Sequence, residues 1–362
     1  MTDSMSPDCL VVALPSKGRM GDAADQFLGR AGLQIYKANQ RQYTATIPNL
    51  PAADVVYQRP RDIVSRVAEG LADIGVTGLD NVLEYGEDSA DIMVIDRLGF
   101  GKCELLLAAP DSWTNVASIA DLADLSLRHQ ERGAPLRIAT KYSNLVKSFM
   151  YRQGISHFLL VHAEGAMEAA PRMGYADLIA DLSETGTTLR ENHLRPIDGG
   201  TIVASEAVLI GNRRTMRQSP PKLETLREML ELIEAHRRAR QFVSLRANIS
   251  GESVADVQGR ILANPALSGT KGPGVVAVAS PPGTDQRWFE TTLLVQSDLI
   301  HKTMQHLRDL GGTDIIVTRP NYVFDQTSET YDRFERLLHS KEGTIGSMLG
   351  RLGESPAGYY WS

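Results

Sequence analysis

The residues best suited to chemistry lie in a short hydroxyl-rich loop, Ser183-Glu184-Thr185-Gly186-Thr187-Thr188. The loop follows an apolar segment, Asp177 to Leu182, which is typical of a buried strand and contains Asp181. Gly186 lets the backbone turn so that successive N–H groups point at one cluster of oxygens, and a helix beginning near Leu189 would add partial positive charge. The loop therefore predicts a phosphate-ester site, with Asp181 placed to accept from sugar hydroxyls or from a metal-bound water. The alternative interpretation is an ordinary strand-to-helix turn whose threonines cap the helix.

Three further loops carry basic or hydroxyl side chains, and each stands between a predicted strand and a predicted helix. These loops are Ser16 to Arg19, Arg59 to Asp62, and Lys141 to Asn144. Strand, loop and helix in this order is how α/β folds build anion sites at the carboxyl ends of strands. Lys17, Gly18 and Arg19 would lie at a helix N-terminus, where a phosphate binds well; the alternative interpretation is that both charges are simply solvated. Together the loops favour a substrate that carries several phosphates.

The elements that must position these loops alternate between strand and helix from Cys9 to Gly211. This alternation predicts parallel or mixed sheets covered by helices. We expect two α/β lobes, the first formed by residues 1–103 with 195–221 and the second by residues 104–194, which hold the hydroxyl-rich loop. A single strand, Val203 to Gly211, would return the chain to the first lobe. Ligands bind in the cleft between two such lobes.

The pattern changes from residue 222 onward. A long amphipathic helix over Leu223 to Arg240 is followed by elements in the order strand, helix, strand, strand, helix, strand. This order predicts a ferredoxin-like α+β domain over residues 222–325, although such a fold does not dictate a role. Residues 326–362 form a tail, helical over Thr330 to His339, to which the sequence assigns no role.

Composition excludes several classes of protein. The chain has 362 residues, of which 42% are hydrophobic and 23% charged, as in globular proteins. A net charge of −6 without a basic block argues against a nucleic-acid partner, and no apolar run reaches the roughly 18 residues of a membrane span. Two cysteines in a chain of this size, and no apolar leader, favour a cytoplasmic protein. Neither Cys9, Cys103 nor the scattered histidines have metal-ligand spacing, and nothing indicates a serine or cysteine nucleophile.

A longer pattern around the loop resembles the signature of the ATP phosphoribosyltransferase family. It runs through Glu168, Gly174, Ala176, Ile179, Asp181-Leu182, Thr185-Gly186 and Thr188-Leu189. Other segments are similar to further blocks of that family: LPSKGRM, RPRDIVSRVAEGLADIGVTGLDNVLEYG, GFGKCEL and RIATKYSNL. The resemblance covers roughly Cys9 to Phe324, and the segments NPALSGTKGP and GGTDIIV are most similar to long, plant-type members with a regulatory domain.

This resemblance implies a fold, a reaction and partners. The fold is a two-lobed catalytic part, like that of periplasmic binding proteins, followed by an ACT-like domain of ferredoxin-like topology. The reaction transfers the phosphoribosyl group of phosphoribosyl pyrophosphate to N1 of ATP, giving phosphoribosyl-ATP and pyrophosphate, the first step of histidine biosynthesis. The resemblance also implies Mg²⁺ as cofactor, histidine and AMP as inhibitors, and a homo-oligomer that we expect to be a hexamer.

Carried onto this sequence, the resemblance also implies roles for single residues. The loop for phosphoribosyl pyrophosphate comprises Asp181, Ser183, Thr185, Gly186, Thr187 and Thr188. Glu168 and Asp181 are the candidate catalytic residues. The candidates for binding ATP or pyrophosphate are Lys17, Gly18, Arg19, Arg59 and Lys141. No side chain is assigned as a direct metal ligand, and no general base is evident.

One segment departs from the family pattern. Relatives with histidine feedback carry a threonine after the Gly-Pro pair of the third domain, where this chain has Gly274 followed by Val275. Because a lost buried donor costs about 1–3 kcal/mol, we expect weak or absent histidine feedback. Two alternatives stay open at this point: a two-lobed small-molecule binding protein without catalysis, and a phosphoribosyltransferase with another nucleophile.

Overall fold

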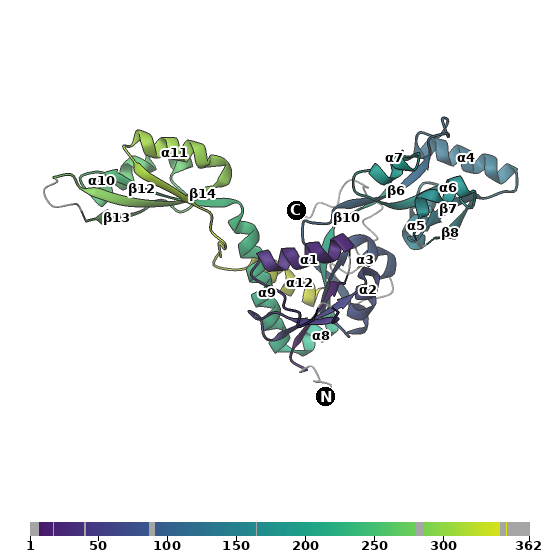
Figure 1. Ribbon diagram of the computed structural model, residues 1–362, viewed down its shortest axis with the longest axis horizontal. Coiled ribbons are helices and arrows are strands. Elements are labelled where there is room, and N and C mark those ends of the chain that lie inside the picture. The colour runs from purple at the N-terminus through teal and green to yellow at the C-terminus, as the bar shows by residue number, and fades with distance from the viewer. Residues whose placement is uncertain are drawn as a thin grey trace. The chain divides into compact units, whose positions relative to one another are not determined.

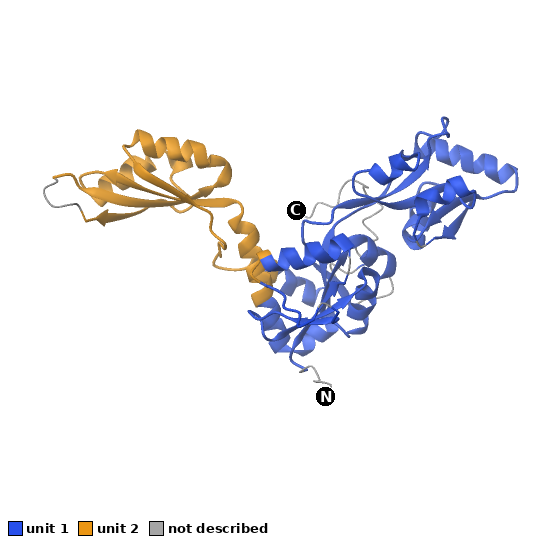
Figure 2. Ribbon diagram, in the orientation of Figure 1, with its two compact units in different colours: residues 1–29, 33–227, 332–362 blue, residues 30–32, 228–331 orange. Residues whose placement is uncertain are grey.

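The computed structural model describes residues 7–16, 18–39, 41–86, 91–163, 165–279, 285–340 and 345. The chain divides into two compact units, each of which is described by itself (Figure 2). Unit 1 contains residues 1–29, 33–227 and 332–362, and unit 2 contains residues 30–32 and 228–331. Unit 1 is built on two sheets, and the parts around them are called lobe I and lobe II.

Lobe I is a mixed sheet with helices. Its strands are β1 (Leu10–Pro15), β2 (Thr44–Thr46), β3 (Ala53–Gln58), β4 (Ile74–Gly78), β5 (Ile92–Arg97) and β11 (Ala207–Asn212). Its helices are α1 (Gly18–Arg30), α2 (Pro60–Glu69), α3 (Leu79–Tyr85) and α8 (Arg213–Gln218) (Figure 1). The strand order is β2-β3-β1-β4-β11-β5, with β1 parallel to β3 and β4, and β11 antiparallel to β4 and β5.

Local sequence explains how lobe I presents its basic residues. Helix α2 begins at Pro60, whose fixed φ suits the first helical position, and it is capped after Glu69 by Gly70, which adopts φ 75°. The buried face of α2 consists of Ile63, Val64 and Val67, which pack into the core of unit 1. The start of α2 therefore holds its basic segment at the carboxyl end of β3.

Lobe II has a second mixed sheet. Its strands are β6 (Cys103–Pro110), β7 (Leu136–Thr140), β8 (Phe158–His162), β9 (Leu178–Ser183) and β10 (Leu194–Ser205). Its helices are α4 (Ile119–Glu131), α5 (Ser143–Arg152), α6 (Ala170–Met173) and α7 (Thr187–Glu191), with a 3₁₀ turn over Met167–Ala169. The strand order is β10-β6-β9-β7-β8; β7 is parallel to β8 and β9, whereas β6 is antiparallel to β9 and β10.

Among the described elements, the chain passes from lobe I to lobe II between β5 and β6 and returns at Glu206, between β10 and β11. The sequence predicts one strand over Val203 to Gly211 and assigns residues 195–221 to lobe I, and the structure differs on both points. The first part of this segment, up to Ser205, pairs with β6 in lobe II. The chain re-enters lobe I only at β11. The pairing partner β6 is distant in sequence, so a local pattern does not reveal it.

Unit 2 has the ferredoxin-like arrangement that the sequence predicts. Its strands are β12 (Phe242–Ser250), β13 (Gly274–Val278), β14 (Trp288–Gln296) and β15 (Thr313–Thr318), and its helices are α10 (Val254–Leu262) and α11 (Ile300–Asp309). The sheet is antiparallel throughout, in the order β13-β14-β12-β15. Leu245, Ile249 and Leu293 of the sheet pack with Val257 and Leu307 of the helices to form its core.

Two helices connect the units along the chain. Helix α9 (Pro220–Ala239) begins in unit 1 and runs into unit 2, and helix α12 (Glu329–His339) leads from unit 2 back into unit 1. The first N–H groups of α12 donate to the carboxylate of Glu234 in α9. Within unit 1, Arg333 donates to Asp96 of β5 at 2.6 Å, and Phe334 is fully buried. Within the predicted tail, residues 332–339 of α12 thus pack as part of unit 1.

The α/β fold class is therefore confirmed, with a two-lobed first unit and a separate C-terminal α+β domain. Among the described residues, no helix combines the length and apolar character needed to cross a membrane.

Candidate active site

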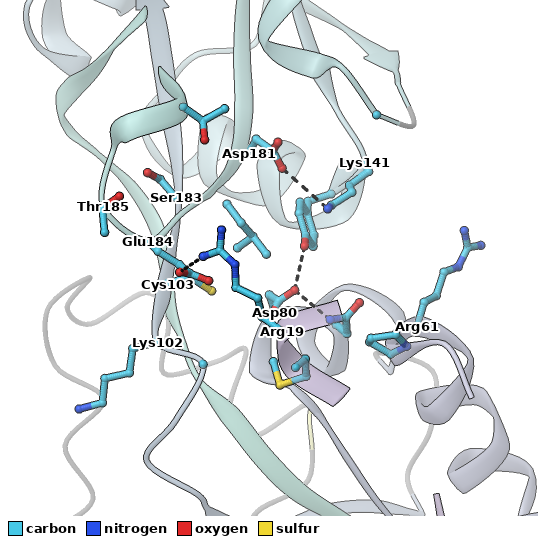
Figure 3. Close-up of a pocket in the computed structure, with 18 of the residues that line it drawn as sticks. Arg19, Arg61, Asp80, Lys102, Cys103, Lys141, Asp181, Ser183, Glu184 and Thr185 are labelled. Atoms are coloured by element: carbon cyan, nitrogen blue, oxygen red, sulfur yellow. Dashed lines mark hydrogen bonds and ion pairs between the residues drawn. The ribbon is translucent and has the colours of Figure 1, made fainter. Parts of the chain in front are cut away.

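A cleft of about 980 Å³ in unit 1 is lined by residues of both lobes (Figure 3). Lobe I contributes the beginnings of α1, α2 and α3, and lobe II contributes the loops after β7 and β9. The lining residues that the sequence predicts are Arg19, Arg59, Lys141, Glu168, Asp181, Ser183, Thr185, Gly186, Thr187 and Thr188. Gly18 begins α1 but is not among the described lining residues, and Lys17 lies outside the described part of the chain.

The hydroxyl-rich loop forms a tight turn between β9 and α7. Gly186 adopts φ 70°, in the left-handed region that favours glycine. Its N–H donates to Ser183 Oγ at 3.0 Å, and the Oγ1 atoms of Thr185 and Thr187 lie 2.9 Å apart. Because the first N–H groups of a helix have no acceptor within that helix, the turn gathers hydroxyls and N–H donors at one place in the cleft. This arrangement suits a bound phosphate.

Arg190 supports the same turn, although the sequence pattern does not indicate this role. Its Nη1 donates to the carbonyl oxygen of Thr185, and its Nη2 donates to Thr187 Oγ1, both at 3.2 Å. The sequence predicts a helix beginning near Leu189, whereas α7 begins at Thr187. The earlier start is what brings the Arg190 guanidinium back over the turn and adds positive charge beside it.

Asp181 and Lys141 form an ion pair at the lobe II side of the cleft (Figure 3). Lys141 Nζ lies 3.8 Å from Asp181 Oδ1, and the Asp181 side chain is 19% exposed. Burial raises the pKa of Asp181 above its ordinary value although Lys141 opposes the shift, and the nearby Glu168 raises it further. A partly buried carboxylate of this kind can accept from ligand hydroxyls or stabilise developing positive charge.

Cations from lobe I face the cleft. Arg19 Nη1 pairs with Glu184 Oε2 at 2.6 Å, but the Arg19 side chain is 87% exposed, so the pair contributes little to stability and leaves the cation accessible to a ligand. Arg61 and Lys102 also line the cleft and were missed as single residues. The R-P-R sequence around Pro60 was the signal for Arg61, and the glycine-flanked GFGKC segment was the signal for Lys102.

The loop from Lys141 to Asn144 differs from its prediction as an anion cradle. Its helix α5 does follow, but the N–H groups of Asn144 and Leu145 donate to the two carboxylate oxygens of Glu84, both at 3.0 Å. These are the N–H groups that an anion would use, so the loop offers the cleft the side chain of Lys141 rather than a helix N-terminus. Glu84 comes from lobe I, and no sequence pattern relates it to this loop.

The described residues of the cleft include neither an activated thiol nor a cluster of side chains able to hold a metal ion. Burial raises the pKa of Cys103 to about 11, and the nearby Asp80 adds to the shift, so the thiol stays protonated at neutral pH. Across the described ranges, no group of three or more His, Cys, Asp or Glu side chains could hold a metal ion. The basic side chains and hydroxyls of the cleft suit a ligand that brings its own negative charge.

Comparison with known proteins places the chain in a family. The family model for ATP phosphoribosyltransferase (HisG) matches residues 59–234, and that for the HisG C-terminal domain matches residues 239–321. ATP phosphoribosyltransferase 1, chloroplastic, of Arabidopsis thaliana is 37% identical over 336 residues, which cover 91% of this chain and 81% of that protein. The ATP phosphoribosyltransferase of Bradyrhizobium sp. (strain ORS 278) is 33% identical over 340 residues, which cover 91% of this chain and 99% of that protein.

Among solved structures, a chain of the ATP phosphoribosyl transferase (HisG:HisZ) complex from Thermotoga maritima is 25% identical, with a TM-score of 0.49. The match covers 62% of this chain and 98% of that one. From the two family models and the extent of the sequence identities, the chain belongs to the ATP phosphoribosyltransferase family, in its long form with a C-terminal domain.

Proposed function

We propose that the cleft of unit 1 carries out the reaction of this family, in which adenine N1 of ATP attacks C1 of phosphoribosyl pyrophosphate. The C1–oxygen bond breaks, pyrophosphate leaves with that electron pair, and phosphoribosyl-ATP forms. Phosphoribosyl pyrophosphate carries a phosphate at one end of its ribose and a pyrophosphate at the other, so its site needs two anion-binding regions. The supporting observation is that the hydroxyl-rich turn of lobe II and basic side chains of lobe I line one cleft.

We assign the 5-phosphate to the turn that contains Gly186. Ser183, Thr185, Thr187 and Thr188 supply hydroxyls there, and Arg190 adds positive charge. Asp181 lies at the end of the strand that leads into the turn, where a ribose attached to that phosphate would place its hydroxyl groups. Its carboxylate would accept from these hydroxyls and stabilise the oxocarbenium character that develops at C1.

The pyrophosphate and the ATP phosphates would then lie toward Arg19, Arg59 and Arg61. Charge on the leaving group increases as the C1–oxygen bond breaks, and fixed cations stabilise that charge without reorganising. Holding both substrates in one cleft also removes much of the entropic barrier of a reaction between two large molecules. Glu168, which lines the cleft close enough to affect the pKa of Asp181, is the second candidate catalytic residue.

Magnesium fits this cleft as a companion of the substrate rather than as a resident of a protein cage. Mg²⁺ is commonly bound by substrate phosphates, waters and one or two carboxylates, and Asp181 is placed to accept from a metal-bound water. When bound, the ion supplies charge neutralisation on the pyrophosphate group. The carboxylates of Asp181 and Glu168 would orient the waters that surround it.

The test is product formation from ATP, phosphoribosyl pyrophosphate and Mg²⁺, followed by the absorbance of phosphoribosyl-ATP. Thr188→Ala and Asp181→Ala are expected to weaken phosphoribosyl pyrophosphate binding, by about tenfold or more where a hydrogen bond to a charged group is lost. Thr114→Ala, an exposed threonine of lobe II outside the cleft, is the matched control. Wild-type affinity in both cleft variants would reject the assignment of the turn. Binding of both substrates without product would favour a non-catalytic binding protein.

We also propose that the chain forms a homo-oligomer, which we expect to be a hexamer. Feedback inhibition by histidine is expected to be weak. AMP is expected to inhibit by competing with the substrates for the cleft. Gly274 begins the exposed edge strand β13 and brings no hydroxyl to it, which supports the loss of a histidine contact. Sedimentation would give the assembly size, and calorimetry with histidine would contradict weakened feedback if binding proved tight. A cytoplasmic location stays a prediction, supported by the two free cysteines.

A further inference from the structure

Helix α3 of lobe I reaches into lobe II through three side chains, Asp80, Glu84 and Tyr85, which we call the α3 clamp. The carboxylate of Glu84 accepts from the N–H groups of Asn144 and Leu145, both at 3.0 Å. The hydroxyl of Tyr85 donates to the carbonyl oxygen of Lys141 at 3.3 Å. Asp80 and Glu84 are 2% and 3% exposed, so both carboxylates of the clamp are buried in unit 1.

Glu84 takes the place of a missing helix cap. The N-cap residue of α5 is Tyr142, which makes no side-chain capping hydrogen bond. The second and third N–H groups of a helix, which a serine or aspartate at the N-cap would normally satisfy, are here satisfied by a carboxylate from the other lobe. The backbone carbonyl of Glu84 also accepts from Asn144 Nδ2 at 3.0 Å. The start of α5 is therefore fixed to lobe I.

Asp80 adds a second attachment. It accepts from the hydroxyl of Tyr142 at 2.8 Å and from Ser205 Oγ at 2.7 Å. Ser205 is the last residue of β10, directly before the chain crosses back to lobe I. The α3 clamp thus holds both the segment before α5 and one of the two crossings between the lobes.

The residues held by the clamp include those that face the cleft. Lys141 and Tyr142 line it, and Lys141 pairs with Asp181. Glu84 itself does not line the cleft, so it can act on a ligand only through these neighbours. For adenine N1 of one substrate to reach C1 of the other, the lobe I cations must be aligned with the hydroxyl-rich turn, and the clamp is placed to set that alignment.

We propose that Glu84 is a positioning residue for phosphoribosyl transfer, which sets the alignment of Lys141 and of lobe II against the lobe I cations; this rests on the proposed function. The 5-phosphate turn belongs entirely to lobe II and does not depend on the clamp. Loss of Glu84 therefore affects the alignment of the reacting groups, and hence kcat, more than the affinity for phosphoribosyl pyrophosphate. If Glu84 had a purely structural role, its loss would lower stability without lowering kcat relative to the affinity for phosphoribosyl pyrophosphate.

The test compares Glu84→Gln with Ser118→Ala. Glutamine keeps the size of glutamate but offers one acceptor oxygen and a donor, so it leaves one N–H of α5 facing another donor. Ser118 caps α4 of lobe II, and its loss also removes a helix cap, away from the cleft. We expect Glu84→Gln to lower kcat at least tenfold while the dissociation constant of phosphoribosyl pyrophosphate stays within twofold of wild type. Ser118→Ala is expected to keep wild-type values of both kcat and this dissociation constant.

Glu84→Gln with wild-type kcat, and a melting temperature lowered only as much as in Ser118→Ala, would overturn the proposal. Equal losses of kcat and of substrate affinity would also overturn it, because the turn itself would then depend on Glu84. If Glu84→Gln does not fold, Ser205→Ala takes its place; it removes the two hydrogen bonds between Ser205 Oγ and Asp80, one from the Asp80 N–H and one to its carboxylate. A several-fold loss of kcat with unchanged affinity for phosphoribosyl pyrophosphate is expected, and wild-type kcat would overturn the proposal. Wild-type enzyme that forms no product would instead reject the proposed function, and the positioning role with it.

Discussion

Gly186→Ala tests whether the turn must keep its backbone conformation to bind the 5-phosphate. Gly186 has φ 70°, and an alanine in the left-handed region is less stable than glycine by about 1–2 kcal/mol. A Cβ at this position would also lie 3.2 Å from Arg190 Nη1, so the guanidinium that supports the turn must move. The turn is largely exposed and can relax in the free enzyme, so the strain returns when phosphate restores the bound conformation.

At about 1.4 kcal/mol for each tenfold change, this strain corresponds to a roughly 5- to 30-fold weaker affinity for phosphoribosyl pyrophosphate. Calorimetric titration with Mg²⁺ present would measure it. The matched control is Gly154→Ala in the same lobe, where φ is 74° and an added Cβ meets nothing within 4 Å. We expect the control to lose stability while keeping wild-type affinity. Unchanged affinity in Gly186→Ala, or equal losses in both variants, would refute the reasoning.

Three further predictions concern residues of the cleft. Arg190→Gln should weaken phosphoribosyl pyrophosphate binding by roughly up to tenfold, because two hydrogen bonds to the turn are lost. Arg190→Lys should restore only part of the affinity, because lysine lacks the planar guanidinium. Wild-type affinity in Arg190→Gln would contradict the proposal that Arg190 supports the turn. Because burial raises the pKa of Asp181 in the folded chain, folding takes up a proton there, and stability falls as pH rises above the ordinary aspartate range. Asp181→Asn should therefore melt higher than wild type at about pH 7, with a difference that shrinks toward about pH 4; the opposite trend in thermal melts would contradict the shift. Cys103→Ala should keep kcat, and iodoacetamide should modify Cys103 faster as pH rises toward its pKa of about 11; rapid modification at neutral pH would contradict a protonated thiol.

The parts of the site that the sequence predicts are those whose chemistry is local. Asp181, Gly186 and the surrounding hydroxyls lie within a few residues of one another, at the end of one apolar strand, so their grouping follows from the chain itself. Arg59 and Lys141 likewise stand directly after strands whose apolar pattern is clear. Lys141 meets Asp181 because β7 and β9 are parallel neighbours, and parallel strands bring their carboxyl ends to one edge of a sheet. Arg59 follows β3 of the other sheet, so this rule does not place it beside them.

The missed parts depend on contacts between segments far apart in sequence. Glu84 and Tyr142 meet Asn144 and Asp80 across the two lobes, and nothing near Glu84 indicates that its carboxylate ends a helix of the other lobe. The boundary at Glu206 was missed because hydrophobicity continues through both strands while the pairing partner changes from β6 to β4 and β5. The hydrophobic pattern of a sequence predicts which strands are buried, but it does not predict to which sheet a buried strand belongs.

The two helical connections make unit 2 an insertion in the chain of unit 1 rather than an appendage at its end. Unit 1 is interrupted after residue 227 and resumes at residue 332, where α12 contributes Phe334 and Arg333 to its packing. A protease nick in either connection would therefore leave unit 2 covalently attached through the other, and two nicks would be needed to release it. The same topology means that an engineered enzyme without unit 2 needs a linker from α9 to α12, because simple truncation before residue 228 would also remove a packed element of unit 1.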